Sequence, residues 1–259
     1  MIATAVFSFR QFQPFDLWRD LLPWTLALAW AREHFPQRIL VADAPGRAML
    51  SALGLPFTEV LDLPPGPVGC GHVYALAKLQ AHVVACDRGE PYLHLDGDAR
   101  LEKPLAPRLH AAPFVSEYRY EAQPYARQLN AKLGRIAALG TGFAAGVAGG
   151  NDLPGIRQWA QRSMDCAHAH AAVLGKCNGF QVGTVLEEIA AGAELAEGAE
   201  MIVADGSQVE AERAGWYHLA SLKRDRAALV QSALTLQFQF PEDYARTWHN
   251  WQLAKQKKH

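Results

Sequence analysis

The sequence has few cysteines, and they are not arranged as a metal or redox motif. Its four cysteines are spread along 259 residues and form no Cys-x-x-Cys pair. This spacing argues against a zinc site and against a thioredoxin-like redox site. Isolated cysteines are typical of reduced thiols, so we expect a cytoplasmic protein. The positions are Cys70, Cys86, Cys166 and Cys177.

Long hydrophobic runs and a strong net charge are also missing. The longest apolar run, residues 21–31, is too short to cross a bilayer and contains Pro23. Residues 1–9 lack the basic start and the long apolar stretch of a signal peptide. We therefore expect no transmembrane segment. The formal net charge of −1 supplies no overall field that attracts nucleic acid, so we expect no nucleic-acid partner.

The sequence does have a large apolar share and a clear alternation of strand and helix patterns. Half of its residues are hydrophobic and a fifth are charged, which suits a globular chain with a large core. The alternation in the first hundred residues predicts an α/β fold with a mostly parallel, Rossmann-type sheet flanked by helices. The expected elements are strand 2–9, helix 16–34, strand 38–42, helix 45–53, strand 58–63, helix 72–86 and strand 92–95.

The second half of the chain is less regular. It contains a glycine-rich segment, 140–152, that is neither a P-loop nor a dinucleotide-binding fingerprint. Its small residues permit the close approach of a ligand or of another backbone. The other expected elements are strand 113–120, helices 123–139, 153–172 and 179–191, and strand 201–204.

Two acids follow a buried strand directly. Asp96 and Asp98 come after the apolar residues 92–95, with only Gly97 between them. Carboxylates at this spacing bind one hard divalent cation when the backbone turns, and Gly97 makes that turn easy. Open α/β sheets bind ligands at the carboxyl ends of their strands. We therefore expect a Mn²⁺ or Mg²⁺ site that serves phosphate chemistry; the alternative is a tight turn with two solvated acids.

Other polar residues are candidates for the same site. Ser8, Arg10 and Asp43 follow two earlier strands, and carboxyl ends of parallel strands share one edge of the sheet. His218 is a candidate third metal ligand, and Lys223, five residues later, is a candidate phosphate contact. The alternative for His218 is a hydrogen-bonded histidine without a metal.

Three stretches together resemble the core of nucleotide-sugar glycosyltransferases of the GT-A fold. They are residues 74–79, residues 91–98 and residues 103–105. The layout is similar to the retaining family that includes bacterial galactosyltransferases and glycogenin. That family has a basic residue in the helix before its Asp-x-Asp and a late His-x-x-Gly-x-x-Lys element. Lys78 matches the first, and residues 218–223 match the second loosely, with Ser221 in place of the glycine and one residue fewer before the lysine.

The resemblance implies a metal-dependent glycosyltransferase that moves a sugar from a nucleotide-diphosphate donor, expected to be a UDP-sugar, to an acceptor hydroxyl. The acceptor is a glycan, lipid or protein that the sequence does not identify. It implies one GT-A-like catalytic domain, residues 1–240, with a nucleotide-binding half (1–105), an acceptor-side half (106–240) and a C-terminal helix or tail (241–259). The implied site residues are Asp96, Asp98 and His218 for Mn²⁺ or Mg²⁺; Ser8, Arg10, Asp43, Lys78, Asp96 and Lys223 for the donor; Ala145, Gly146, Gly149 and Gly150 on the acceptor side; and Gln181, which follows Phe180 rather than the family's acid, as the catalytic candidate.

Three alternatives remain at this stage. A nucleotidyltransferase shares the sheet and the metal-binding acids, but the glycine-rich signature expected near the first strand is not found there. A phosphatase with an Asp-x-Asp nucleophile places that motif at its first strand, whereas here it lies at 96–98. A catalytically degenerate GT-A-like module that only binds or assembles fits the imperfect His218 element. The sequence does not fix whether transfer retains or inverts configuration.

Overall fold

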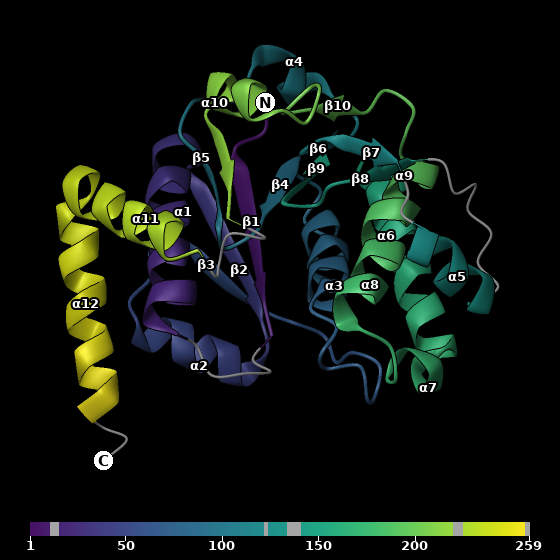
Figure 1. The fold of residues 1–259 in the computed structure, drawn as a ribbon, viewed down its shortest axis with the longest axis horizontal. Helices are drawn as coiled ribbons and strands as arrows, with labels where there is room; N and C mark the ends of the chain where they lie inside the picture. The colour runs from purple at the N-terminus through teal and green to yellow at the C-terminus, as the bar shows by residue number, and fades with distance from the viewer. Residues whose placement is uncertain (11–15, 122–123, 134–140, 220–224, 257–259) are drawn as a thin grey trace.

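The computed structural model of the chain describes residues 1–10, 16–121, 124–133, 141–219 and 225–256. The first hundred residues follow the predicted order of strands and helices (Figure 1). The strands are β1 (Thr4–Phe9), β2 (Gln37–Ala42), β3 (Glu59–Asp62), β4 (Tyr92–Leu95), β5 (Ala99–Leu101), β6 (Val115–Ser116), β7 (Arg119–Glu121), β8 (Thr141–Phe143), β9 (Val147–Gly150), β10 (Glu200–Met201) and β11 (Trp216–His218).

The helices are longer than most of the strands and include two π-helical segments. They are η1 (Leu17–Leu21), α1 (Leu22–His34), α2 (Ala44–Ala52), α3 (Ala75–Cys86), α4 (Pro107–Ala111), α5 (Pro124–Lys132), α6 (Leu153–Ala169), α7 (Ala171–Leu174), α8 (Gly179–Gly183), η2 (Thr184–Ile189), α9 (Ala190–Glu194), α10 (Gln208–Ala214), α11 (Arg226–Gln239) and α12 (Pro241–Gln256). The predicted helix 123–139 corresponds to α5 in its described part, and residues 134–140 lie outside the described residues.

Seven strands form the central sheet in the order β10-β6-β9-β4-β1-β2-β3. β1 pairs in parallel with both β2 and β4, and β2 pairs in parallel with β3. β9 runs antiparallel to its two neighbours, β4 and β6, whereas β10 is parallel to β6. The predicted fold class, a mostly parallel sheet flanked by helices, is confirmed.

The glycine-rich segment contains two strands that the sequence did not predict. β8 pairs with β7 in a separate two-stranded ribbon, and β9 lies inside the main sheet. A Cβ atom on Gly149 would lie 2.3 Å from the carbonyl oxygen of Tyr92, and one on Gly150 would lie 2.3 Å from that of Pro113. Both glycines also have a positive φ, which side-chain-bearing residues rarely adopt. The close approach expected here is therefore made by neighbouring backbone.

The single strand expected at 113–120 is two strands in two different sheets, β6 and β7. The strand expected at 201–204 is also shorter and shifted, because β10 covers only Glu200–Met201. Short strands of two or three residues provide too few alternating positions for a sequence pattern to define their ends.

Helices cover both faces of the sheet (Figure 1). Along β1, Ala5 and Phe7 face one core together with α1, α2 and α11, and Val6 faces the other core together with α3 and α6. This alternation follows from the two-residue period of a strand, and a strand buried on both faces is apolar throughout. The layers hold the strand ends in fixed positions, which is what a binding site at that edge requires.

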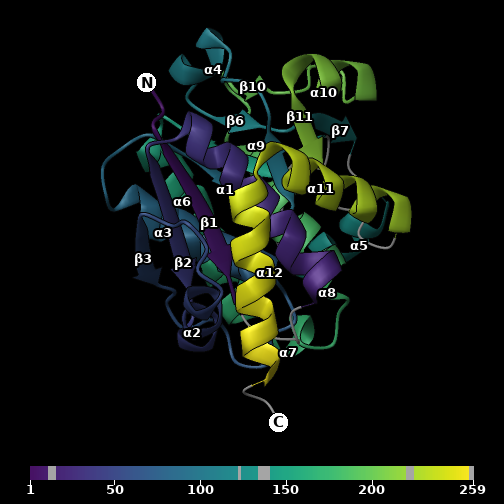
Figure 2. The same ribbon diagram turned by 90° about the vertical axis from the view of Figure 1, so that its left-hand side faces the viewer.

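The C-terminal helices α11 and α12 pack against α1, and α12 lies lengthwise over that side of the molecule (Figure 2). The carboxylate of Asp243 in α12 is buried and pairs with Arg32 at 2.9 Å. The hydroxyls of Thr25 and Thr247 are 3.1 Å apart and also link α1 to α12. Within the described part of the chain, no helix is both long enough and apolar enough to cross a membrane.

Candidate functional site

The chain path through the central sheet changes direction at β1. From β1 the chain adds β2 and then β3 on one side, and it then adds β4 on the other side of β1. In open α/β sheets, ligands bind outside the carboxyl ends of the strands at this switch point. Ser8 lies near the end of β1 and Asp96 directly follows β4. Ser8 and Asp96 therefore lie at the position that the topology favours.

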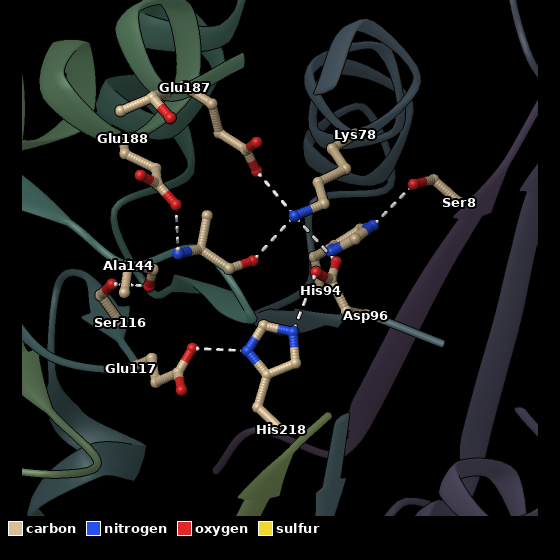
Figure 3. A network of polar contacts seen from close by, with 12 residues as sticks. Ser8, Lys78, His94, Asp96, Ser116, Glu117, Ala144, Glu187, Glu188 and His218 are labelled. Carbon is tan, nitrogen blue, oxygen red and sulfur yellow. Dashed lines mark hydrogen bonds and ion pairs between the residues drawn. The ribbon is translucent and has the colours of Figure 1, made fainter. Parts of the chain in front are cut away.

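Asp96, Asp98 and His218 form a cluster of two carboxylates and an imidazole. Their candidate ligand atoms all lie within 4.8 Å of one another. The Nε2 atom of His218 is 3.5 Å from Asp96 Oδ2 (Figure 3). It is also 3.8 Å from Asp98 Oδ1. The structure thus places His218 beside the two acids, and its role as a metal ligand stays a prediction.

A small antiparallel ribbon positions His218 beside the two aspartates. β5 begins immediately after Asp98 and pairs with β11, with His218 opposite Ala99. The backbone amide of Leu219 donates to the carbonyl of Asp98 at 3.1 Å. Gly215, with a φ of 69°, ends α10 in the left-handed conformation and precedes β11. Two segments far apart in the sequence are thus fixed to each other by backbone hydrogen bonds.

The glycine between the two acids is required by packing. A Cβ atom on Gly97 would lie 1.8 Å from Cε2 of the Trp24 indole. Trp24 belongs to α1 and is buried. The turn that carries Asp96 and Asp98 therefore rests directly on the ring of Trp24.

Lys78 is buried, and its ammonium group lies between two carboxylates and a backbone carbonyl. Its Nζ atom is 2.8 Å from Asp96 Oδ1, 3.2 Å from Glu187 Oε1 and 3.0 Å from the carbonyl oxygen of Ala145 (Figure 3). Burial lowers the pKa of Lys78, but the charges of Asp96 and Glu187 outweigh it and hold the pKa well above the ordinary value. Lys78 therefore stays charged and joins the Asp-x-Asp turn to η2.

Glu187 and Glu188 are site residues that the sequence did not single out. Burial raises the pKa of Glu187 to about 8, even though Lys78 acts in the opposite direction. Burial also raises the pKa of Glu188, which accepts from the hydroxyl of Tyr120 and, at 3.4 Å, from the amide of Ala145. Two adjacent acids in an apolar helical stretch were the available signal, because carboxylates are rarely buried without a partner.

The pKa of His218 is raised by the carboxylates that surround its ring. Burial lowers its pKa, but hydrogen bonds to Asp96 and Glu117 raise the pKa to about 10. The charge of Lys78 together with the hydrogen bond from His218 holds the pKa of Asp96 below its usual range despite burial. The cluster therefore combines closely spaced positive and negative groups in a partly enclosed place.

Ser8, Arg10 and Asp43 lie at the same sheet edge, but each already has a partner. The hydroxyl of Ser8 is 2.9 Å from Nε2 of His94. Arg10 donates to the side-chain oxygen of Gln80 at 2.5 Å and to the carbonyl of Pro64 at 3.1 Å. Asp43 caps α2 by accepting from the amide of Gly46 at 2.9 Å.

The remaining predicted residues fall in different surroundings. Ala145 and Gly146 lie beside the cluster, since the carbonyl of Gly146 accepts from the amide of Asp96 at 3.0 Å. Gly149 and Gly150 are buried inside the sheet. Gln181 is exposed near the start of α8. Lys223 lies outside the described residues.

Two solved structures resemble the chain over most of its length at low sequence identity. One is a mouse xyloside xylosyltransferase 1 in its apo form, with 12% identity, a TM-score of 0.43, and coverage of 78% of this chain and 85% of that one. The other is described as a mannose-1-phosphate geranyltransferase from Thermus thermophilus, with 16% identity, a TM-score of 0.39, and coverage of 78% and 73%.

No curated protein sequence matches the chain significantly. A family model described as "Family of unknown function (DUF6734)" matches residues 18–249, which include the whole cluster and every strand of the central sheet except β1. The chain belongs to this family, DUF6734.

Proposed function

We propose that the protein is a metal-dependent glycosyltransferase that moves a sugar from a nucleotide-diphosphate donor to an acceptor hydroxyl. The observation that carries the proposal is the meeting of Asp96, Asp98 and His218 at the switch point of the sheet. A metal site at that edge is where a diphosphate would be bound. The GT-A resemblance of the sequence around Lys78 and Asp96 supports the same reaction.

The donor set suits a divalent cation of the Mn²⁺ type. Ligands bound to one ion at roughly 2.2 Å lie at most about 4.4 Å apart, so a cluster within 4.8 Å needs only a small contraction. Carboxylates suit Mg²⁺ and Mn²⁺, and an imidazole favours a transition metal over Mg²⁺. Asp96, Asp98 and His218 would hold the ion, and when bound it would neutralise the charge that develops on the diphosphate leaving group.

The chain's own residues prepare this site before a donor arrives. Lys78 holds Asp96 through Oδ1, so the other oxygen, Oδ2, is the one that faces His218. The Lys78 ammonium also keeps positive charge next to the position where the leaving group becomes negative. Ser8 and Arg10 lie at the end of the neighbouring strand β1 and are the proposed contacts of the nucleotide, together with Asp43.

The acceptor is proposed to enter beside Ala145 and Gly146, where the backbone borders the cluster. Glu187 and Glu188 lie behind this backbone and are held by Lys78 and by the amide of Ala145. The sugar carbon that is attacked becomes oxocarbenium-like, as in glycoside hydrolysis. Water-poor surroundings strengthen the electrostatic effect of the buried charges on that carbon. Gln181 stays a predicted catalytic residue, and Lys223 a predicted phosphate contact.

The test is a nucleotide screen by thermal shift and calorimetry, with UDP, GDP and CMP, each with and without Mn²⁺. We expect UDP to bind only with Mn²⁺, and Asp98→Asn to weaken that binding by more than about 100-fold, because it removes a charged ligand. The screen is run at both pH 7 and pH 8 because metal binding depends on the protonation of His218. This histidine has to release its Nε2 proton when a metal binds, and its pKa is raised to about 10.

The matched control is Asp87→Asn, which removes the exposed carboxylate that pairs with Arg157 at 2.8 Å, away from the cluster. It should leave nucleotide binding unchanged. Hydrolysis of a UDP-sugar by the parent, and its loss in Asp98→Asn, separates a transferase from a module that only binds. Incorporation of a nucleotide into a sugar phosphate would instead support a nucleotidyltransferase. If Asp98→Asn binds UDP and Mn²⁺ as the parent does, the proposal is wrong.

A further inference from the structure

His218 is held from the side opposite the two aspartates by a buried carboxylate. The Nδ1 atom of His218 lies 2.9 Å from Oε2 of Glu117 (Figure 3). Glu117 directly follows β6 and its side chain is one-tenth exposed. Nothing in the sequence marked it, because it follows a two-residue strand and belongs to no motif.

This contact determines which nitrogen of the imidazole faces the aspartates. An imidazole that donates its Nδ1–H to a carboxylate presents Nε2 as its second nitrogen. Nε2 is the atom that lies 3.5 Å from Asp96 and 3.8 Å from Asp98. Without Glu117 the ring is free to rotate or to carry its proton on the other nitrogen.

The surroundings of Glu117 and His218 hold the two side chains in contact. Hydrogen bonds hold the backbone of Glu117 on both sides: its amide donates to the carbonyl of Ala144 at 3.2 Å, and its carbonyl accepts from the amide of Val203 at 2.8 Å. A Cβ atom on Gly146 would lie 2.4 Å from both Glu117 Oε2 and His218 Nδ1. Only a glycine at that position leaves room for this hydrogen bond.

We propose that Glu117 is a positioning residue that orients His218 so that Nε2 points at the metal and nucleotide site. The proposal rests on the proposed function, because it assigns Glu117 to the same site. Carboxylates behind metal-binding histidines fix the ring and increase its basicity, and their removal typically weakens metal affinity by about 10- to 100-fold. Glu117 acts through His218 and is not itself a ligand.

The first experiment measures Mn²⁺ binding alone by calorimetry. We expect Glu117→Ala to weaken binding by about 10- to 100-fold and Glu117→Gln, which keeps an acceptor oxygen, to weaken it less. In a His218→Ala background, Glu117→Ala should add less than a factor of about 2, because the two residues act as one unit. Glu200→Gln is the control, since Glu200 also pairs with a cation, Arg108, but on the strand β10.

Gly146→Ala breaks the same contact without removing a charge. The added methyl group lies where the carboxylate and the imidazole meet, so this variant should lose Mn²⁺ affinity to the same extent as Glu117→Ala. A loss in Glu117→Ala that persists in the His218→Ala background would show a general structural effect and overturn the proposal. Unchanged Mn²⁺ affinity in Glu117→Ala, where His218→Ala loses it, would also overturn it.

The second experiment needs no metal and separates the two proposals. In ¹⁵N-histidine NMR spectra, the parent should show a His218 Nδ1–H that is hydrogen-bonded and slow to exchange. Glu117→Ala should lose that signal, and Glu117→Gln should shift it. If the parent binds no Mn²⁺ but shows the signal, the metal assignment fails and the positioning role stands. A parent spectrum without the signal overturns the positioning role itself.

Discussion

At the scale of the residue, Lys78 shows how the molecule uses a buried charge. The sequence predicts that Lys78 contacts the sugar donor, and in the structure its ammonium group lies against Asp96, Glu187 and the backbone carbonyl of Ala145. Breaking a buried ion pair leaves an uncompensated charge that costs several kcal/mol, whereas keeping it gives a fixed geometry. Its first effect is therefore to orient Asp96.

A buried histidine makes the protein sensitive to acid. Burial lowers the pKa of His94 to about 3. Below the ordinary histidine pKa of about 6.5, His94 takes up a proton in the unfolded chain, whereas its buried ring stays neutral in the folded chain. The stability from the neutral ring is present above pH 6.5 and is lost as the pH falls toward 3. We expect this group to lower the free energy of unfolding by up to about 1.4 kcal/mol per pH unit in that window.

The measurement is urea unfolding of the parent and of His94→Gln between pH 7 and pH 4. The variant should lose less stability over this range than the parent, because no proton is excluded at position 94. His168→Gln is the control, since His168 is exposed on α6 and its replacement should leave the slope unchanged. Equal slopes in all three proteins would contradict the prediction.

The sequence predicted part of the site at this scale. Asp96 and Asp98 are recognisable because acids that end an apolar strand lie at a sheet edge. The place of Glu117 depends on how β6 pairs with β9, and that of Glu187 and Glu188 on how η2 packs against α3, so their partners do not follow from the local sequence. The role of an acidic residue inside an apolar segment cannot be assigned from the sequence until its partners in the fold are known.

At the scale of the element, α1 and the turn after β4 are matched in shape. A methyl group on Gly97 overlaps the indole of Trp24. We expect Gly97→Ala to destabilise the protein by about 1–3 kcal/mol, the usual cost of overpacking, and to weaken Mn²⁺ binding because the two acids move. Thermal unfolding and calorimetry measure the two effects.

Combining Gly97→Ala with Trp24→Leu tests the cause. The double variant should be less destabilised than the sum of the two single variants, because the smaller side chain makes room for the methyl group. Gly71→Ala is the control: a Cβ atom at Gly71 has no atom within 4 Å, so the change should stay within about 0.5 kcal/mol. Additive effects of Gly97→Ala and Trp24→Leu would show that the indole is not the obstacle.

The sequence predicted elements well where they are long and poorly where they are short. Alternation over the first hundred residues predicted β1 to β4 because each of the first three strands is followed by a helix with clear periodicity. β9 was missed because Gly149 and Gly150 are typical of loops, yet here glycine is what lets three backbones approach. Such a requirement is visible only when the neighbouring strands are known.

At the scale of the whole molecule, the two halves of the sequence are interlocked. β9 belongs to the second half but is hydrogen-bonded to β4 of the first half, and α6 packs against α3. We expect one cooperative unfolding transition, because neither half keeps its core without the other. The predicted halves 1–105 and 106–240 would then be regions of a single folding unit.

Fluorine NMR of 5-fluorotryptophan-labelled protein measures this directly. Trp24 reports on the core under α1 and Trp159 reports on the core under α6. Their signals, assigned by single Trp→Phe variants, should disappear at the same urea concentration. Midpoints that differ would show that the halves unfold separately.

The ribbon that pairs β5 with β11 has a consequence for protein synthesis. A chain still attached to the ribosome exposes both aspartates of the turn early, but its imidazole emerges only after most of the polypeptide has been made. The cluster of Asp96, Asp98 and His218 is therefore completed late in translation. A truncated product that ends before β11 would carry the acids without their histidine.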